Sequence, residues 1–532
     1  MALSEMHAKK AGFTVAAMVA ATLFAKLLGM ARQILIAGIF ADSLEGVAFA
    51  AASKIPFAIF DMLFSAAVLG SFIPIYRGAL SSQPERARKF SSSFFAGIAV
   101  LTAGTAVLGM IFAREILFLS APNLDDKTAA LAADLLRIMF PAMIFAGAAY
   151  TLIGILQSHE SFILPSLVSA VSNLVIIAAL LFYRNADRMS AVYGLSAAYL
   201  VSWVVQFLTM AVPLLRRHRF PRPAADFKNP DLRLSVKRSL PVMLGSWLIP
   251  VGTLTATFFS SYIPAQTNGG AIVIFDYAFS VYSIIAGVLT YGVCNYIFPK
   301  LSEKAALGDT EGFSASVRGG LFAALALILP AAAGTFILSE DGIRLLYLHG
   351  DFTEELTAAV SGSLRMLTLA MPAYCIIELL SRVFYSCGKV RYPMYAAVCG
   401  MLTGFLCSLA LLLSDSLTTA GAALSIALGQ ITAAAALFFF CCRAIPGIFP
   451  RRGLSKAVWT SLSFLASAAV MAAVRYLLSK KFVNFGAFRN FLVIAIVFLA
   501  GVVVYLICMI VTKTIAYPRL GQNRGEADGR RR

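Results

Sequence analysis

The chain has 532 residues, of which 60% are hydrophobic and 13% are charged, and its mean hydropathy is +0.82. No soluble globular class has this balance, which is typical of a polytopic membrane protein. The formal net charge of +18 does not indicate a nucleic-acid partner. The basic residues lie mainly in short segments between apolar runs, where they report membrane topology.

Fourteen segments are long and apolar enough to be transmembrane helices, which need about 20 residues each. In chain order they are residues 12–40, 47–76, 90–113, 129–157, 161–183, 190–215, 240–263, 271–299, 314–338, 355–387, 392–414, 418–442, 455–479 and 487–512. Membrane β-strands run to only about ten residues with alternating hydrophobicity. The predicted fold is therefore all-α.

The first two spans contain four ionisable residues, Lys26, Arg32, Lys54 and Asp61. An ionisable side chain in hydrocarbon costs roughly 3 kcal/mol or more, so it usually faces a bundle interior or a water-filled cavity. We therefore predict that these two helices line a cationic cavity. Two alternatives stay open. Lys26 and Arg32 could snorkel to an interface, and Lys54 could form a structural pair with Asp61 on the same helix face.

Later spans contain further charges within the membrane. Glu378 and Arg382 are four residues apart with the acid first, the order that favours a helix ion pair. Arg382 could also join the bases of the first two spans around an anion, because its guanidinium fork suits phosphate. Asp276 could pair with one of these bases or bind a cation. We expect Asp61, Asp276 and Glu378 to act as charge partners or in gating.

The loops predict the orientation, because short cytoplasmic loops are enriched in Lys and Arg. Basic residues gather after the even-numbered spans, as in residues 77–89, 216–238 and 443–452, and again in the tail from 513 to 532. The opposite loops are acidic or neutral, as at Asp42, Asp125 and Asp351. Both termini are therefore expected on the cytoplasmic side.

The sequence also repeats itself. A shift of 228 residues superposes Arg137 on Arg365, Ser158 on Ser386 and Pro165 on Pro393. Parallel repeats of this kind are typical of transporters, whose substrate site lies between the two halves near mid-membrane. The predicted organisation is a first lobe at 1–215, a basic linker at 216–239, a second lobe at 240–443, two additional helices at 444–514 and a basic tail at 515–532.

Motifs for catalysis and metal binding are missing. There is no nucleotide-binding G-x-x-x-x-G-K-[ST] loop and no H-E-x-x-H, and no segment outside the spans is long enough for a catalytic domain. The eight cysteines lie within apolar spans or at their ends, and imply neither disulfides nor a zinc site. We therefore predict a transporter that is not an enzyme and holds no metal.

Four stretches resemble the MurJ/MviN lipid II flippases of the multidrug/oligosaccharidyl-lipid/polysaccharide exporter superfamily. They are AKLLGMARQILIAGIF with SKIPFAIFDMLFSAAVLGSFIPIY, then YGVCNYIFPKLS, then LLSRVFYSCGKVRYP. In this resemblance Arg32 matches an essential first-helix arginine, Lys26 a basic position before it, and Lys54 the lysine of a second-helix K-[IL]-P. The chain departs from the family pattern at Val47, at Ser65 and Ala66, and at Phe279 and Ser280, where family members have charged residues or Glu-Gly.

The resemblance implies a flippase that moves undecaprenyl-pyrophosphate-linked peptidoglycan precursor between leaflets of the bacterial inner membrane. The head group would contact Lys26, Arg32, Lys54 and Arg382, while the lipid tail would follow a groove at the last two spans. We expect membrane lipids and the cell-wall synthesis machinery as partners. We expect no cofactor, with coupling to the membrane potential or a monovalent cation. The alternatives are a flippase for another polyprenyl-linked glycan, a MATE-like drug/cation antiporter and, less favoured, a membrane-embedded glycosyltransferase.

Overall fold

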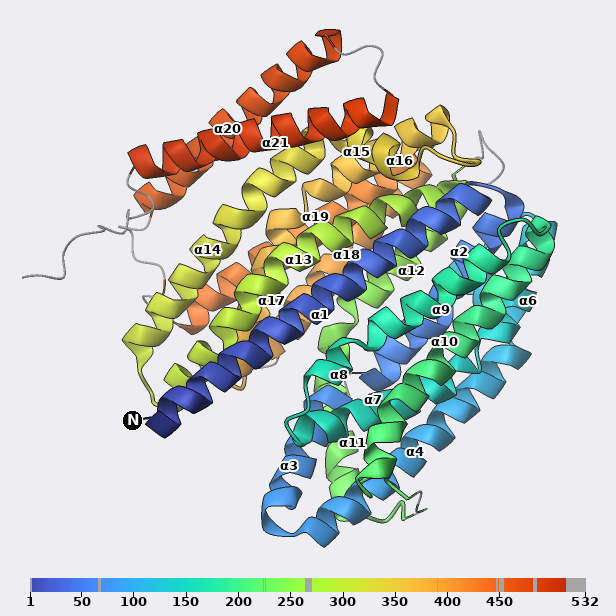
Figure 1. Cartoon of the computed structure of the whole chain (residues 1–532), viewed down its shortest axis with the longest axis vertical. Coiled ribbons are helices and arrows are strands. Elements are labelled where there is room, and N and C mark those ends of the chain that lie inside the picture. The colour runs from blue at the N-terminus through green and yellow to red at the C-terminus, as the bar shows by residue number, and fades with distance from the viewer. Residues whose placement is uncertain are drawn as a thin grey trace, which may run out of the picture.

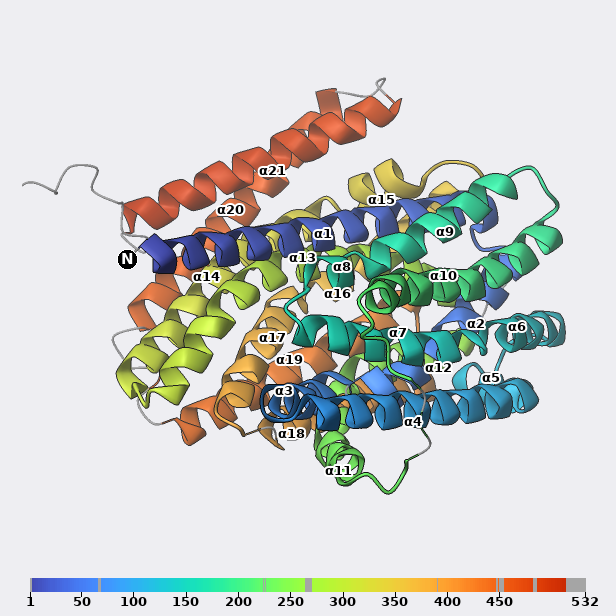
Figure 2. The same cartoon turned by 60° about the horizontal axis from the view of Figure 1, so that its bottom comes forward.

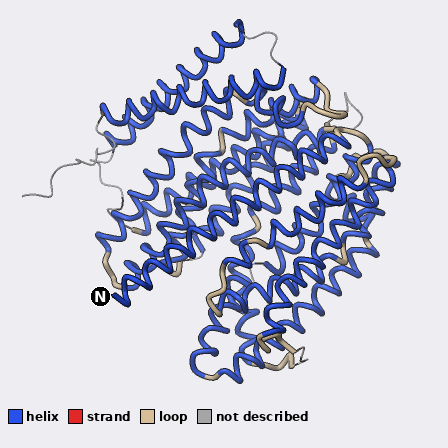
Figure 3. Tube along the Cα trace, in the orientation of Figure 1, coloured by secondary structure: helices blue, strands red, loops and turns tan. Residues whose placement is uncertain are grey.

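The computed structural model describes residues 2–65, 68–222, 224, 226–263, 270–389, 391–445, 448, 454–481 and 486–512 (Figure 1). Within these ranges every regular element is a helix and none is a strand (Figure 3). The all-α prediction is confirmed. The predicted tail, 515–532, lies outside the described residues.

The first half of the chain forms one group of helices. They are α1 (Ala2–Phe40), α2 (Leu44–Phe60), the π-helical segments η1 (Asp61–Ser65) and η2 (Val68–Phe72), α3 (Ile73–Ser82), α4 (Pro84–Ile111), α5 (Ala113–Ser120), α6 (Asp126–Met139), α7 (Ala142–Ser158), α8 (Ile163–Ser166), α9 (Val168–Phe182) and α10 (Arg188–Arg216). We call this group the N-lobe.

The second group, the C-lobe, is followed by a separate C-terminal pair. The C-lobe contains α11 (Pro230–Ser246), α12 (Leu248–Ser261), α13 (Ala271–Ala306), α14 (Thr310–Ile337), α15 (Ser339–Tyr347), α16 (Glu354–Thr368), α17 (Met371–Ser386), α18 (Arg391–Leu413) and α19 (Thr419–Ala444). The pair is α20 (Leu454–Lys481) and α21 (Gly486–Val511). Figures 1 and 2 show this pair on the outside of the bundle beside α14.

Among the described residues, ten helices are long and apolar enough to cross a membrane, or up to twelve if each of two bent helix pairs is one span. The prediction of fourteen spans is therefore higher than this count. The difference lies in residues 161–183, where α9 has only 15 residues, and in 240–263, where α11 and α12 are separated at Trp247. The chain is a multi-pass membrane protein.

The two bent pairs occupy equivalent places in the two lobes. α6 and α7 meet at 40°, and α16 and α17 meet at 44°. Asp126 and Glu354 begin the pairs, and Ser158 and Ser386 end them, at the 228-residue offset seen in the sequence. Proline lacks the N–H that a continuous helix needs, and Pro141 and Pro372 lie at the two bends. The repeat is thus also present in the shape of the helices.

The second predicted span is not one continuous helix. Residues 47–76 divide into α2, two wide π-helical turns and α3. Within this segment the Met62 carbonyl accepts a hydrogen bond of 2.9 Å from the indole N–H of Trp247 of the C-lobe. Ser71 contacts Ser235 and Ser239 of α11 at 2.7 and 2.8 Å. The broken segment is therefore a contact between the lobes.

The predicted linker, 216–239, contains the first part of α11. Pro230 lies at the start of this helix, where its missing N–H costs nothing. Arg86 of α4 holds Asp231 through two hydrogen bonds of 2.8 and 2.6 Å, which lower the pKa of the Asp231 carboxyl. α11 is thus bound to the N-lobe through the buried acid of its first turn.

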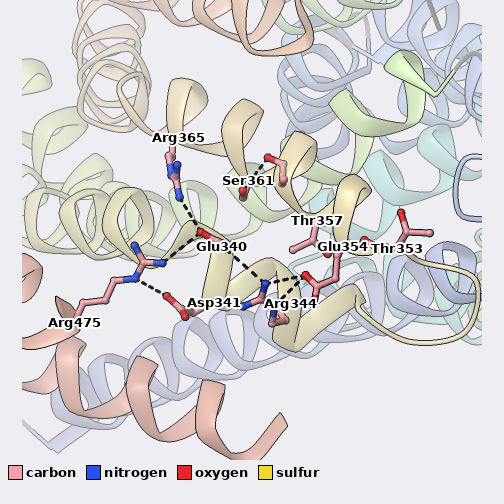
Figure 4. Close-up of polar contacts among 10 residues, drawn as sticks. Glu340, Asp341, Arg344, Thr353, Glu354, Thr357, Ser361, Arg365 and Arg475 are labelled. Carbon is pink, nitrogen blue, oxygen red and sulfur yellow. Dashed lines mark hydrogen bonds and ion pairs between the residues drawn. The ribbon is translucent and has the colours of Figure 1, made fainter. Parts of the chain in front are cut away.

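The C-terminal pair attaches to the C-lobe through apolar packing and a charge network. Met471 and Val497 pack against Ala333 and Leu338. Figure 4 shows the network, in which Arg475 of α20 reaches α15. The ion-pair distances are 2.7 Å for Arg475–Asp341, 3.5 Å for Arg475–Glu340, 3.5 Å for Arg365–Glu340, 3.6 Å for Arg344–Glu340 and 2.8 Å for Arg344–Glu354.

The lobes meet at the end of the bundle where α1 finishes, which we call the acidic end because Asp42, Asp125 and Asp351 lie there. The Asp351 N–H donates to the Gly38 carbonyl at 3.2 Å, and Arg188 pairs with the Asp351 carboxylate at 2.6 Å. Gly350 has φ of +62°, and a Cβ on it would collide with the Gly38 carbonyl. Backbone therefore contacts backbone at this closure.

We predict that Gly350→Ala weakens the closure at the acidic end. The substitution forces an alanine into the left-handed region and pushes the loop away from Gly38, at a cost of about 1–3 kcal/mol. The measurement is the thermal unfolding midpoint of the detergent-solubilised protein, which should fall.

Gly362→Ala in α16 is the matched control, because a Cβ there meets nothing within 4 Å. Its midpoint should stay the same or rise, since alanine favours a helix more than glycine does. Equal midpoints for Gly350→Ala and the wild type would contradict the tight closure.

Candidate functional site

A cavity of about 740 Å³ lies between the two lobes. Its walls come from α1, α2, α7, α8, α9 and α10 on one side and from α13 on the other. The described charged residues that line it are Lys26, Arg32, Lys54 and Asp276. The structure therefore brings three basic side chains from the first two spans into one cavity, whose wall has an excess of positive charge among its described residues.

Arg32 projects from α1 to α9. Its Nη1 donates to Oδ1 of Asn173 at 3.0 Å, and the Asn173 Nδ2 donates to the Ala25 carbonyl of α1 at 3.0 Å. The Arg32 Nε is buried and has no hydrogen-bond partner among the described residues. The guanidinium is therefore held at one end by a neutral amide, while part of its donor set remains for a ligand.

Lys54 forms an ion pair across the lobes. Its Nζ lies 2.9 Å from Oδ1 of Asp276 on α13, and the two side chains are 12% and 22% exposed. This result selects one of the two predictions for Asp276, pairing with a base. Asp61, the other predicted partner of Lys54, lies seven residues further along, where α2 ends and the π-helical turns begin.

Lys26 of α1 lies against α13 beside Gly287. A Cβ on Gly287 would be 2.8 Å from the Lys26 Nζ, so glycine makes room for the ammonium group. The same Nζ is 5.9 Å from the centroid of the Tyr291 ring, and the Arg382 guanidinium carbon is 5.7 Å from that centroid. A cation at this distance from an aromatic face is attracted by the ring quadrupole. Tyr291 therefore brings together one base from each lobe.

Glu378 and Arg382 do not line the large cavity with the other predicted residues. They form the expected pair within α17, at 3.6 Å, with side chains 23% and 19% exposed. Glu378 instead borders a smaller, mainly apolar cavity of about 160 Å³ within the C-lobe. Arg382 lies beside the Tyr291 ring, which lines the large cavity.

The sequence interpretation missed Asn173 and the aromatic wall of the cavity. Tyr150, Tyr199 and Trp203 line it, and Trp203 stacks on Phe57 at 6.1 Å between ring centroids. A signal for Asn173 was present, because it is an amide within an otherwise apolar span, and such residues usually face the bundle interior. No periodicity distinguishes the aromatic residues of this wall from lipid-facing ones.

The arrangement is suited to holding an anion beside aromatic surface. Clustered Lys and Arg side chains offset the desolvation of a phosphate or carboxylate, and Arg adds bidentate geometry. Within the part of the chain that the structure describes, no group of three or more His, Cys, Asp or Glu side chains could hold a metal ion. Fold and site together define a two-lobed transporter with a cationic cavity between its lobes.

The chain belongs to a family of such transporters. The family model described as "Lipid II flippase MurJ" matches residues 36–498. A probable lipid II flippase MurJ of Rhizobium tropici is 27% identical over 473 residues, which cover 87% of this chain and 86% of that protein. The lipid II flippase MurJ of Burkholderia cenocepacia is 25% identical over 384 residues, which cover 71% of this chain and 73% of that protein. The resemblance found in the sequence is confirmed, and the family is one of transporters, not enzymes.

Solved structures support the same fold. A lipid II flippase MurJ in an inward closed conformation matches with a TM-score of 0.77 and 23% identity, over 93% of this chain and 98% of that one. An inward-facing multidrug resistance MATE family transporter of the MOP superfamily matches with a TM-score of 0.66 and 15% identity, over 80% and 95%. The architecture is therefore shared with both of these structures.

We predict that Asp276→Asn destabilises the protein by about 1–3 kcal/mol, because it leaves the Lys54 ammonium within the membrane without its counter-charge. The measurement is the unfolding midpoint of the detergent-solubilised protein. The double variant Lys54→Gln, Asp276→Asn should recover most of the loss, since both charges are then removed.

Arg137→Gln is the control, because it breaks an ion pair whose side chains are 46% and 51% exposed. Exposed pairs contribute little, so its midpoint should not change measurably. The single variant Lys54→Gln completes the set. If the loss of stability in the double variant equals the sum of the losses in Lys54→Gln and Asp276→Asn, the two residues do not form the pair described.

Proposed function

We propose that this protein is a lipid II flippase, which moves the undecaprenyl-pyrophosphate-linked peptidoglycan precursor from the cytoplasmic to the outer leaflet. The observation on which this rests most is the cavity between the lobes, whose described charged residues are three bases and one acid. The family supports the substrate, because its members are described as lipid II flippases.

The charge of the cavity suits a pyrophosphate head group. Moving a net charge across the membrane involves about 2.3 kcal/mol per elementary charge per 100 mV, and basic residues compensate the anion while it is out of water. Lys26 and Arg32 are the bases without a carboxylate partner among their described contacts, so they are the first ligands for the anion. Lys54 becomes available to the anion when Asp276 separates from it. Arg382 is the fourth proposed ligand, and the anion would contact it beside the Tyr291 ring.

Transport proceeds by alternating access between the two lobes. The contacts at the acidic end, Gly38 with Asp351 and Arg188 with Asp351, are short and join the N-lobe to the C-lobe. Opening this end requires them to separate. The Lys54–Asp276 pair also joins the lobes, so an anion that binds Lys54 competes with the interaction that holds them together.

The orientation follows from charge. We propose that the basic loops face the cytoplasm, with both termini on that side of the bacterial inner membrane. The polyprenyl tail stays in lipid along α20 and α21, whose outward side chains Leu465, Leu477 and Leu499 are exposed apolar residues. The membrane potential or a monovalent cation supplies the driving force, and the cell-wall synthesis machinery supplies or receives the substrate.

A drug/cation antiporter of the same superfamily fits the cavity less well. Such a protein requires acidic residues that attract a cationic substrate, and the one described acid of the cavity wall is already paired with Lys54. The fold does not discriminate between these functions, because MATE transporters share it. The positive charge of the cavity wall favours an anionic substrate over a cationic drug.

We predict that the wild-type chain restores lipid II transport in a bacterium depleted of its own flippase, and that Arg32→Ala does not. Removing the guanidinium takes away one of the two bases that no carboxylate neutralises. The measurement is the amount of lipid II in the outer leaflet, normalised to the protein present in the membrane.

Arg137→Ala is the matched control, an arginine of the exposed surface, and should restore transport as the wild type does. Rescue by Arg32→Ala would leave the function standing and remove Arg32 from the site. No rescue by well-expressed wild type would exclude lipid II and point to another polyprenyl-linked glycan.

A further inference from the structure

Asn173 is the most unusual residue of the cavity wall that the proposed function does not yet use. It lies on α9, a 15-residue helix of otherwise mostly apolar side chains, and only 7% of it is exposed. A buried amide in this setting costs free energy unless both its ends are hydrogen-bonded. Arg32 and Ala25, both on α1, form hydrogen bonds with the two ends of the Asn173 amide.

The orientation of the amide is determined by its two partners. The Ala25 carbonyl only accepts hydrogen bonds, so it must face the Asn173 Nδ2, and the Arg32 guanidinium only donates, so it must face Oδ1. Both distances are 3.0 Å. Gly29 lies between these contacts on α1, and a Cβ there would be 3.3 Å from the Asn173 Nδ2. The amide therefore cannot flip without losing both bonds.

Lys54 and Arg32 each have a side-chain partner close by, at 2.9 and 3.0 Å, but the two partners differ in charge. Lys54 is held by a carboxylate, which neutralises it, whereas Arg32 is held by an amide, which does not. An aspartate has nearly the same size as an asparagine and would make a stronger bond to the guanidinium. It would also cancel the charge and turn an oxygen toward the Ala25 carbonyl.

We propose that Asn173 is a positioning residue for the substrate anion: it aims the Arg32 guanidinium into the cavity and, being neutral, leaves its whole charge for the anion. The proposal rests on the proposed function, since it takes a pyrophosphate-headed lipid as the ligand. Asn173 acts through Arg32 and does not itself need to touch the ligand.

The experiment measures binding of farnesyl pyrophosphate, and of uncharged farnesol, to the purified full-length protein in detergent by isothermal titration calorimetry. The variants are Asn173→Ala, Asn173→Asp, Arg32→Ala and the double variant Arg32→Ala, Asn173→Ala. Ser196→Ala on α10 is the matched control, because it removes a buried hydroxyl that bonds only within its own helix. Gel filtration and unfolding midpoints identify any misfolded variant.

Asn173→Ala should weaken binding of farnesyl pyrophosphate about tenfold, the effect of misplacing a charged hydrogen-bond donor. Asn173→Asp should weaken it at least as much despite its similar size. Farnesol binding should not change, and on the Arg32→Ala background Asn173→Ala should add no further loss. A structural role alone would not produce this selectivity for the charged ligand.

Two results would overturn the proposal. One is unchanged farnesyl pyrophosphate binding by Asn173→Asp, and the other is a loss from Asn173→Ala that adds to that of Arg32→Ala. Either result leaves the proposed function intact, provided that the wild type binds farnesyl pyrophosphate more tightly than farnesol. Failure of the folded wild type to do so would overturn the proposed function and this inference together.

Discussion

The cost of placing a charge within the membrane shapes this molecule more than any other constraint. Each base of the cavity has a different means of meeting that cost: a carboxylate for Lys54, an amide for Arg32 and an aromatic ring for Lys26. These partners are not equivalent, because only the carboxylate neutralises its base. The cavity therefore keeps a positive potential in a region where a uniformly paired set of residues would have none.

The same side chains also connect the two lobes. Lys54 and Lys26 belong to helices of the N-lobe, and their partners Asp276 and Tyr291 belong to α13 of the C-lobe. α1 itself packs on both α9 and α13, as Figure 1 shows. The charges that would bind an anion are thus among the contacts that hold the lobes together. This arrangement gives a ligand a direct physical means of changing the lobe interface.

The two lobes repeat one arrangement of bent helices but contribute differently to the cavity. Both contain a bent helix pair at equivalent positions, with a proline at the bend. The N-lobe provides the three bases of the wall, whereas the C-lobe provides Asp276 and the Tyr291 ring, and keeps its own Arg382 paired with Glu378. The two lobes are therefore alike in the shape of these helices but differ in the charged side chains that they contribute to the cavity.

Sequence alone determined the helical membrane fold, the internal repeat and the presence of bases in the first two spans. Hydrophobic length and a costly charge are local signals, and a repeat is visible as a constant offset between matching residues. It did not determine the partners of those bases. Lys54 pairs with Asp276, and Arg32 bonds to Asn173, and these partners lie 222 and 141 residues away along the chain. Only the packing of α1 and α2 against α9 and α13 brings them within hydrogen-bonding distance. Tertiary structure likewise broke the second span into π-helical turns, since the Trp247 indole and two serines of α11 provide partners that no local pattern predicts.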